Sequence, residues 1–145
     1  ERKSILRLIA EYNPFLLDVE FNTIQKDKKL TSYLKKSKCK LLISWHDFKK
    51  TPSDSQLRTK FNKMRKFSDI VKIVTVAKNV SDASRLLSLY SIKSKNKTIA
   101  FCMGEQGKFS RILCLHLGSP FTYVSLGKAV APGQFSVDEI KSLSY

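Results

Sequence analysis

Residues Ile70–Val76, Ile-Val-Lys-Ile-Val-Thr-Val, are the stretch from which the fold of this chain is read. The run is rich in β-branched side chains and is bounded by polar segments, which predicts a strand buried on both faces. Lys72 lies in its middle, where an ammonium group is costly unless it is paired or loses its proton. A buried lysine that loses its proton is a nucleophile suited to Schiff-base chemistry. The alternative is that Lys72 reaches the rim of the sheet or lies on an exposed face.

The other apolar segments alternate between the two-residue period of strands and the helical period. Further strands are predicted at Leu16–Phe21, Leu41–Ser44, Thr98–Met103 and Phe121–Ser125. Helices are predicted at Arg2–Tyr12, Leu30–Ser37, from Thr51 to about Phe67, around Ala83–Tyr90, at Phe109–Leu117 and after Ser136.

Capping residues indicate where three of these helices begin. Thr51 is the predicted cap of one helix, with Pro52 in the first helical position. Asn79 or Ser81 caps the next helix, and Ser136–Glu139 forms a capping box for the last one.

Strand and helix thus alternate with a spacing of roughly 25–30 residues, the size of one βα unit. Five consecutive units predict an α/β fold, a part of a (β/α)8 TIM barrel, in one domain over residues 1–145. A flavodoxin-like open sheet is the rival fold, because a whole barrel needs about 250 residues. No G-x-G-x-x-G motif follows a strand, so a dinucleotide-binding fold has little support.

The chain is strongly basic, with 27 Lys and Arg against 12 Asp and Glu and a formal charge of +15. Such a charge raises the alternative of a nucleic-acid-binding domain. The basic residues are spread along the chain, however, and the densest run, Lys35–Lys40, falls at a helix-to-strand junction. We therefore interpret the charge as a solvated surface that favours small anionic substrates.

Cys39, Cys102 and Cys114 lie in or beside apolar segments and have no C-x-x-C spacing. Free buried thiols in a reducing, cytoplasmic compartment are expected. His46 and His116 do not combine with them at ligand spacing, so no metal site is predicted. No apolar run approaches the length of a membrane span.

Reactive side chains follow the ends of the predicted strands, which converge on one mouth in a parallel barrel. His46 is a candidate general acid–base, with capping of its own strand through Asp47 as the alternative. Arg111 follows a glycine-containing loop and could hold a carboxylate with both arms of its guanidinium, with an ordinary surface cation as the alternative. Met103 is expected in the core or lining a pocket.

Several segments together resemble type I 3-dehydroquinate dehydratase, the Schiff-base enzyme of the shikimate pathway of aromatic amino-acid biosynthesis. The matching pieces keep the family's order and approximate spacing, and together they cover most of the chain from Asp18 onward. They are Ser44–Phe48 with Thr51-Pro52, Val71–Ile73, Met103 through Ser110-Arg111, Gly118-Ser119 and Ala131-Pro132-Gly133-Gln134.

The resemblance implies a (β/α)8 lyase without a cofactor, of which this chain carries the fourth to eighth strands. It implies that Lys72 forms an imine with the C3 ketone of 3-dehydroquinate and that His46 is the acid–base. It further implies that Arg111 holds the substrate carboxylate, that Gln134 binds a ring hydroxyl and that Met103 lines the pocket.

The chain departs from the family pattern in two ways. Val130 stands where the family usually has a serine. The family's first three strands are absent, and with them further substrate-binding residues and the carboxylate that orients the histidine. Asp18 and Glu20 match the acidic pair of the fourth strand and are candidates to lie below or beside the imidazole, although neither is an obvious replacement. Because the chain leaves an open sheet edge and only half of the substrate site, we expect it to be inactive alone.

Two other functions remain as alternatives. A class I aldolase-like barrel enzyme would share the lysine but not the pairing of Arg111 with Gln134. A nucleic-acid-binding domain is suggested by the charge alone, without a recognition helix or an aromatic stacking platform. The expected partner is the small anion 3-dehydroquinate, with neither nucleic acid nor membrane, and a homodimer is left open.

Overall fold

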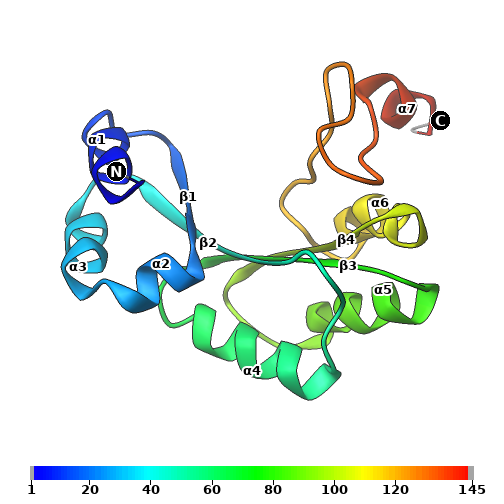
Figure 1. Ribbon diagram of the computed structural model, residues 1–145, viewed down its shortest axis with the longest axis horizontal. Helices are drawn as coiled ribbons and strands as arrows, with labels where there is room; N and C mark the ends of the chain where they lie inside the picture. Colours follow the sequence, from blue (N-terminus) through cyan, green and yellow to red (C-terminus); the bar gives the residue numbers. More distant parts are fainter. Residues whose placement is uncertain (1, 144–145) are drawn as a thin grey trace.

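A parallel sheet of four strands forms the centre of the computed structural model, which describes residues 2–143. The strands are β1 (Leu16–Glu20), β2 (Lys40–Asp47), β3 (Ile70–Val76) and β4 (Lys97–Met103). They are hydrogen-bonded side by side in chain order, β1-β2-β3-β4 (Figure 1). Sequential order is the arrangement of a (β/α) barrel, whereas a flavodoxin-like sheet has the order 2-1-3-4-5. The flavodoxin-like alternative is therefore wrong, and the chain is a partial barrel.

Helices connect the strands and cover the sheet. They are α1 (Arg2–Glu11), α2 (Phe21–Lys26), α3 (Lys28–Lys36), α4 (Asp54–Met64), α5 (Val80–Leu87), α6 (Ser110–His116) and α7 (Val137–Ser142), with short 3-10 turns at Ser88–Ser91 and Glu105–Gly107. Helices α4 and α5 run along one side of the sheet, and the segment between α6 and α7 rises on the other side (Figure 1).

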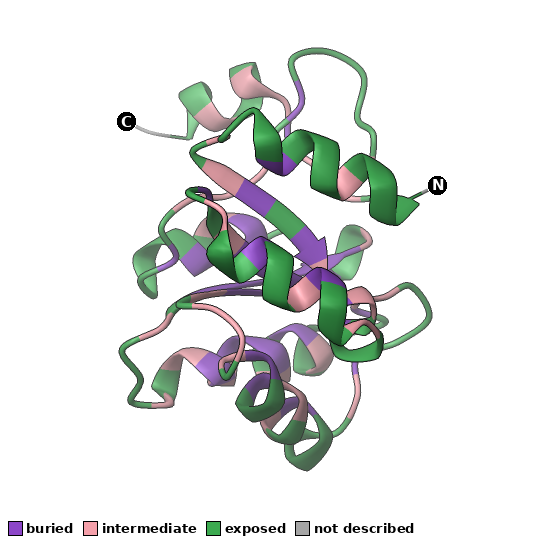
Figure 2. Cartoon of the chain, turned by 90° about the vertical axis from the view of Figure 1, so that its left-hand side faces the viewer, coloured by how far each residue is buried: buried purple, intermediate pink, exposed green. Residues whose placement is uncertain are grey.

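Alternate strand residues face opposite sides of the sheet, as the two-residue period of strands requires. One set packs with the helices in the larger core, among them Val19, Ile43, Ile73 and Ala100 with Leu57, Phe61 and Leu86. The other set forms a second apolar cluster with residues of α6 and the following segment, among them Leu42, Val74, Phe101, Met103, Cys114 and Tyr123. Figure 2 shows the buried strands lying between helices whose outer surfaces are exposed. Lys72 shares the second face with Val74, two residues further along β3.

Several predicted boundaries are confirmed. Strand β3 covers Ile70–Val76, and its five central residues are buried. Asn79 caps α5 by accepting a hydrogen bond from the backbone N–H of Asp82 at 2.9 Å. Ser136 and Glu139 form the capping box of α7.

The predicted start of α4 is wrong by two residues. Ser53, not Thr51, is the cap, and it forms a capping box with Gln56. The Thr51 hydroxyl is buried and contacts the Thr75 hydroxyl at 2.7 Å and the Val76 carbonyl at 2.9 Å. Thr51 therefore links the loop to the end of β3. Its hydroxyl is buried and must be hydrogen-bonded there, whereas the exposed Ser53 hydroxyl is free to cap the helix.

The segment between β1 and β2 contains two helices instead of the one predicted. Helix α2 follows β1 directly and buries Phe21 and Ile24. Asp27 separates the two helices and caps α3 by accepting from the backbone N–H of Leu30 at 2.9 Å. The second helix therefore begins at Lys28, two residues before the predicted start.

The predicted strand over Phe121–Ser125 is not formed. Ser125 makes a single bridge with Ser136. The Ser125 N–H donates to the Phe135 carbonyl at 2.9 Å, and the Ser125 carbonyl accepts from the Val137 N–H at 3.0 Å. Ser125 thus pairs with the chain that returns from the next loop and not with β4. A strand forms only where a neighbouring strand satisfies its backbone groups, and the rest of this segment has no such neighbour in the described structure.

Candidate active site

We call the sheet face that carries Lys72 and Val74 the inner face. It carries four charged or titratable side chains on three neighbouring strands. Asp18 and Glu20 lie on β1, His46 on β2 and Lys72 on β3. The parallel register places Glu20 beside Ser44, and Ser44 beside Lys72. His46 is two residues beyond Ser44 and therefore faces the same side. The sheet brings these side chains to one face, as the barrel prediction requires.

Lys72 is buried and ion-paired. Its side chain is 9% exposed, and its Nζ donates to Asp18 Oδ2 at 2.7 Å. The Tyr123 hydroxyl lies 3.4 Å from the same nitrogen. Burial by itself lowers the pKa of Lys72, but the hydrogen bond and charge of Asp18, together with Tyr123, outweigh it, and the pKa lies above its ordinary value.

This pairing corrects one expectation. The alternative that Lys72 extends to the rim or lies on an exposed face is wrong, because the residue is 7% exposed. Of the two ways in which a buried ammonium can be tolerated, pairing or loss of its proton, the structure shows pairing. Asp18 contributes the compensating charge that the strand pattern alone did not reveal, and it pairs with the lysine and not with the imidazole.

His46 is oriented by a carboxylate. Its Nδ1 contacts Glu20 Oε1, and its ring stacks on that of Phe48 with centroids 5.6 Å apart. A carboxylate on one ring nitrogen fixes the tautomer and leaves Nε2 to exchange protons. Glu20 therefore makes the contact that the sequence analysis assigned to a carboxylate outside this chain. A small hollow of about 180 Å³ next to this pair is lined by Asp18, Glu20, Ser44 and His46, together with Arg2, Leu6 and Val19.

Arg111 is a buried cation that has no acidic partner among the described residues. It is 2% exposed, and its Nε has no hydrogen-bond partner among residues 2–143. Its Nη2 donates weakly to the Pro132 carbonyl at 3.5 Å, and its Cζ lies 4.6 Å from the centre of the Phe101 ring. Burial lowers the pKa of Arg111. A guanidinium that is desolvated and uncompensated is suited to receive an anion, preferably a carboxylate that both arms can bind. The surface-cation alternative is wrong.

Met103 is the last residue of β4, and Gln134 lies in a loop that contacts this end of the strand. The Gln134 side-chain oxygen accepts from the Val130 N–H at 3.0 Å, within the loop that the two residues share. This loop is fixed to the strand end by the Gly104 N–H, which donates to the Pro132 carbonyl at 3.1 Å. Met103 is buried in the second apolar cluster, on the inner face of the sheet. Val130, at the position where the family resemblance leads us to expect a serine, is 88% exposed and gives the loop no side-chain hydrogen bond.

Tyr123 was missed as a site residue by the sequence analysis. It lies in the segment predicted as the last strand, where alternation would have shown that it faces the same side as Phe121 and Ser125. Contact with Lys72 could not be foreseen, since it depends on how the segment crosses the sheet.

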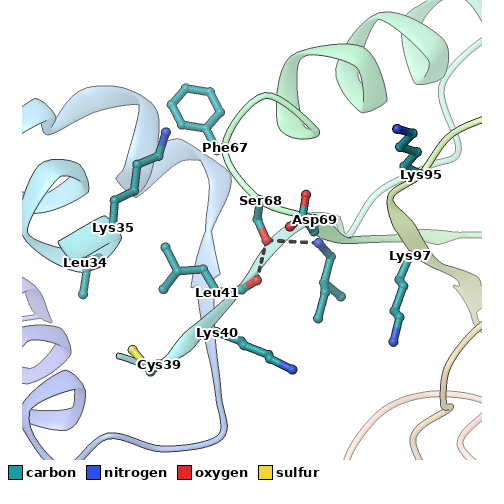
Figure 3. A pocket seen from close by; sticks show the side chains of 11 residues that line it. Leu34, Lys35, Cys39, Lys40, Leu41, Phe67, Ser68, Asp69, Lys95 and Lys97 are labelled. Carbon is teal, nitrogen blue, oxygen red and sulfur yellow. Dashed lines mark hydrogen bonds between the residues drawn. The ribbon is translucent and has the colours of Figure 1, made fainter. Parts of the chain in front are cut away.

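A larger hollow of about 590 Å³ lies at the opposite end of the sheet, near the first residues of β2, β3 and β4. Figure 3 shows the lysines around it, Lys35, Lys40, Lys95 and Lys97, with Asp69 between them. It includes part of the densest basic run in the sequence and is separate from the candidate site.

No three His, Cys, Asp or Glu side chains within residues 2–143 lie together in a way that could hold a metal ion. None of the helices in the described part of the chain is long and apolar enough to cross a membrane.

Comparison with known proteins gives consistent findings. The family model described as type I 3-dehydroquinase matches residues 1–145. The 3-dehydroquinate dehydratase of Pyrobaculum aerophilum is 42% identical over 139 residues, which are 94% of this chain and 44% of that protein. The 3-dehydroquinate dehydratase structure from Aquifex aeolicus superimposes with a TM-score of 0.82 at 31% identity, over 98% of this chain and 64% of that one.

A type I 3-dehydroquinate dehydratase structure from Clostridium difficile, which holds covalently modified comenic acid, superimposes with a TM-score of 0.84 at 26% identity. The match covers 98% of this chain and 59% of that one. The chain therefore spans between about half and two thirds of the length of the proteins that it matches.

Proposed function

Because the chain belongs to the type I 3-dehydroquinase family, we propose that the protein dehydrates 3-dehydroquinate to 3-dehydroshikimate through an imine on Lys72. The observation that carries this proposal is the single sheet face on which Lys72 and a carboxylate-oriented histidine lie on neighbouring strands. No other lysine in the described chain combines such burial with a position on this face.

The first half of the proposed reaction forms the imine. The Lys72 ammonium gives up a proton to His46, and the free Nζ attacks the C3 carbonyl carbon of the substrate. His46 returns this proton to the C3 oxygen, which leaves as water, and the carbon–nitrogen double bond forms as a protonated imine. The resulting cation withdraws electrons from C2, which makes the C2 proton acidic.

The second half eliminates the C1 hydroxyl. His46 takes the C2 proton, and the electron pair of the C–H bond moves toward the protonated imine to give an enamine. The enamine then expels the C1 hydroxyl, which leaves as water with the proton returned by His46. A second water hydrolyses the imine and frees Lys72, so that the net change is the loss of one water.

Arg111 is proposed to bind the substrate carboxylate, which supplies the anion that this buried guanidinium lacks in the described structure. Gln134 would exchange its bond to the Val130 N–H for a ring hydroxyl of the substrate. Met103 would form part of the apolar wall. None of these steps calls for a cofactor.

Asp18 and Glu20 have separate proposed roles. Asp18 holds Lys72 in place as an ammonium and accepts its hydrogen bond. Glu20 orients His46 and stabilises the imidazolium that forms when the ring takes the C2 proton. We assign the enzyme to the cytoplasm, because Cys39, Cys102 and Cys114 are free thiols. The homodimer stays a prediction for sedimentation analysis.

The experiment is an assay of 3-dehydroshikimate formation by the protein at its natural length and by its Lys72→Met variant. The family assignment predicts turnover by the wild type and a loss of at least about 10³-fold in the variant, as expected when a covalent nucleophile is removed. Equal turnover by the two proteins would contradict the proposal. An aldolase-like enzyme would instead cleave a carbon–carbon bond and would leave 3-dehydroquinate unchanged.

A further inference from the structure

Two buried cations of the site each lie against an aromatic ring. Lys72 Nζ is 4.6 Å from the centre of the Tyr123 ring, and Arg111 Cζ is 4.6 Å from the centre of the Phe101 ring. The two rings are neighbours, with centroids 5.9 Å apart and planes at 51°. One aromatic pair thus connects the nitrogen assigned to the imine with the guanidinium assigned to the substrate carboxylate.

Tyr123 contacts Lys72 with its hydroxyl as well as with its ring. The hydroxyl lies 3.4 Å from Nζ, while Asp18 Oδ2 lies 2.7 Å from it. The lysine nitrogen is therefore held from two elements far apart in sequence, namely β1 and the segment at residues 121–125. The flexible four-carbon side chain of Lys72 loses conformational freedom, because the contacts with Asp18 and Tyr123 both fix its end.

The segment that carries Tyr123 packs on the sheet through Phe121 and Tyr123, which lie against the second apolar cluster. Its backbone bonds lie at its ends, where the Ser119 hydroxyl donates to the Phe121 carbonyl at 2.8 Å and Ser125 pairs with the returning chain. Between these ends, Phe121 packs edge-on against Tyr123 with centroids 5.7 Å apart. Together with the packing of Phe121, the contacts of Tyr123 with Lys72 and Phe101 hold the middle of the segment over this face of the sheet.

We propose that Tyr123 is a positioning residue of this site, whose ring and hydroxyl hold the Lys72 amino group against Asp18. The proposal rests on the proposed function for the meaning of Lys72, but its test uses no substrate. It assigns to a tyrosine in an irregular segment a role that neither the strand pattern nor the motifs indicated.

The charged and titratable groups around Lys72 on the packed elements are Asp18 and Glu20 on β1, His46 on β2, Arg111 on α6 and Tyr123 itself. Asp18 and Tyr123 reach the nitrogen. The Tyr123→Phe variant keeps the ring and removes the hydroxyl acceptor, so the ammonium form loses one partner. The Tyr123→Leu variant removes the ring as well, and with it the cation–π contact.

The experiment measures how readily Lys72 is acetylated as a function of pH. The protein at its natural length is pulsed with acetic anhydride, and the label on the Lys72 peptide is quantified by mass spectrometry. The midpoint of labelling should fall by about half a pH unit in Tyr123→Phe, which is roughly a threefold gain in free amine at a given pH. It should fall by about one pH unit in Tyr123→Leu, a roughly tenfold gain.

The matched control is Tyr33→Phe, which removes a tyrosine hydroxyl that contacts Glu11 Oε1 at 3.1 Å on the surface of α3. It should leave the Lys72 midpoint unchanged. A Tyr123→Phe midpoint equal to that of the wild type, in protein with an unaltered melting temperature, would overturn the proposal. Failure to turn over 3-dehydroquinate would contradict the proposed function and would not move this titration, so the two failures are distinguishable.

Discussion

At the scale of single residues, Lys72 and Asp18 set the resting state of the site. A nucleophilic lysine must be neutral to attack a carbonyl, yet the carboxylate beside Lys72 keeps its pKa above the ordinary value. The ion pair therefore holds the proposed nucleophile as an ammonium, and in the proposed reaction substrate binding has to release the proton. Because Lys72 must lose a proton before it can attack, we expect a base near it. His46, on the neighbouring strand, is the candidate for this base.

Replacement of Asp18 by Asn should lower the pKa of Lys72, since it removes the charge that outweighs burial. The variant should also be less stable at neutral pH, because Lys72 is then buried without its counterion. The expected loss is only about 1–2 kcal/mol, since the Asp18 side chain is 38% exposed and solvent partly screens the ion pair in the wild type. Urea unfolding measures the stability and pulse acetylation the pKa. A Lys72 labelling midpoint unchanged in Asp18→Asn would contradict the assignment of the counterion.

The pH dependence of stability has a definite sign. The pKa of Lys72 is raised in the folded state, so its contribution is fully present below the unfolded value of about 10.4 and is lost as the pH rises through the folded value. In Asp18→Asn the folded pKa of Lys72 falls toward or below the unfolded value, so this stabilising contribution should be smaller at neutral pH. Unfolding free energies measured between neutral pH and strongly alkaline pH would show whether the two curves approach each other at the alkaline end, as this account requires.

Arg111 should be more important for binding than for folding. Replacement by Met removes a buried charge that has no acidic partner among residues 2–143, so the stability should be unchanged or higher by up to about 2 kcal/mol. The same change should raise the KM for 3-dehydroquinate by 10²-fold or more, because a bidentate contact to a carboxylate is lost. Arg58→Met, at an exposed pair with Asp54, is the control for stability. A large loss of stability in Arg111→Met would show that Arg111 serves the fold.

The individual site residues were predictable to different extents. Lys72, His46 and Arg111 stand out because a reactive or charged group follows or interrupts an apolar run. The pairings of Asp18 with Lys72 and Glu20 with His46 could not be predicted, since they depend on the register between strands. A one-residue shift of β1 would have turned both carboxylates toward the helices.

At the scale of elements, the loop from Lys128 to Gln134 is held on the end of β4 by glycine. Gly133 has φ +69°, and a Cβ on it would lie 2.6 Å from the Gly104 carbonyl oxygen. Gly133→Ala should therefore cost roughly 1–3 kcal/mol of strain, which the loop would relieve by moving away from the strand. We expect a higher KM for 3-dehydroquinate, because Gln134 moves with the loop.

Gly127→Ala is the matched control, because a Cβ there meets no heavy atom within 4 Å. Steady-state kinetics of the two variants should differ by about tenfold or more in KM. Equal KM values in Gly133→Ala and the wild type would show that the close approach of the loop is not needed for substrate binding.

The predicted elements succeeded where local chemistry decides the structure. The β-branched run at Ile70–Val76 is a strand in both prediction and structure. The choice between Thr51 and Ser53 as a cap could not be made locally, because a tertiary bond to Thr75 decides it. The segment at Phe121–Ser125 has the composition of a strand but is not one, since strand formation needs a paired neighbour.

At the scale of the whole molecule, the sheet has two outer strands, β1 and β4, each hydrogen-bonded to one neighbour in the described structure. A (β/α)8 barrel closes with eight strands, and the relatives extend beyond the matched region. We expect the 145-residue chain alone to turn over 3-dehydroquinate at least about 10²-fold more slowly than a full-length relative. Equal kcat/KM values for the two polypeptides would contradict this expectation.

The high positive charge makes a separate prediction at this scale. The charge of +15 should speed the capture of an anionic substrate and make kcat/KM fall as salt is added. Tight binding to duplex or single-stranded nucleic acid, with a steep dependence on salt, would instead favour the nucleic-acid-binding alternative.

Reductive trapping tests most directly whether Lys72 carries the substrate as an imine. The protein at its natural length is incubated with 3-dehydroquinate and borohydride, and the modified peptide is located by mass spectrometry. We predict one stable adduct on Lys72, in the peptide that contains Val71-Lys72-Ile73, and none in Lys72→Met. A substrate adduct on any other lysine, or the absence of an adduct during active turnover, would contradict the account.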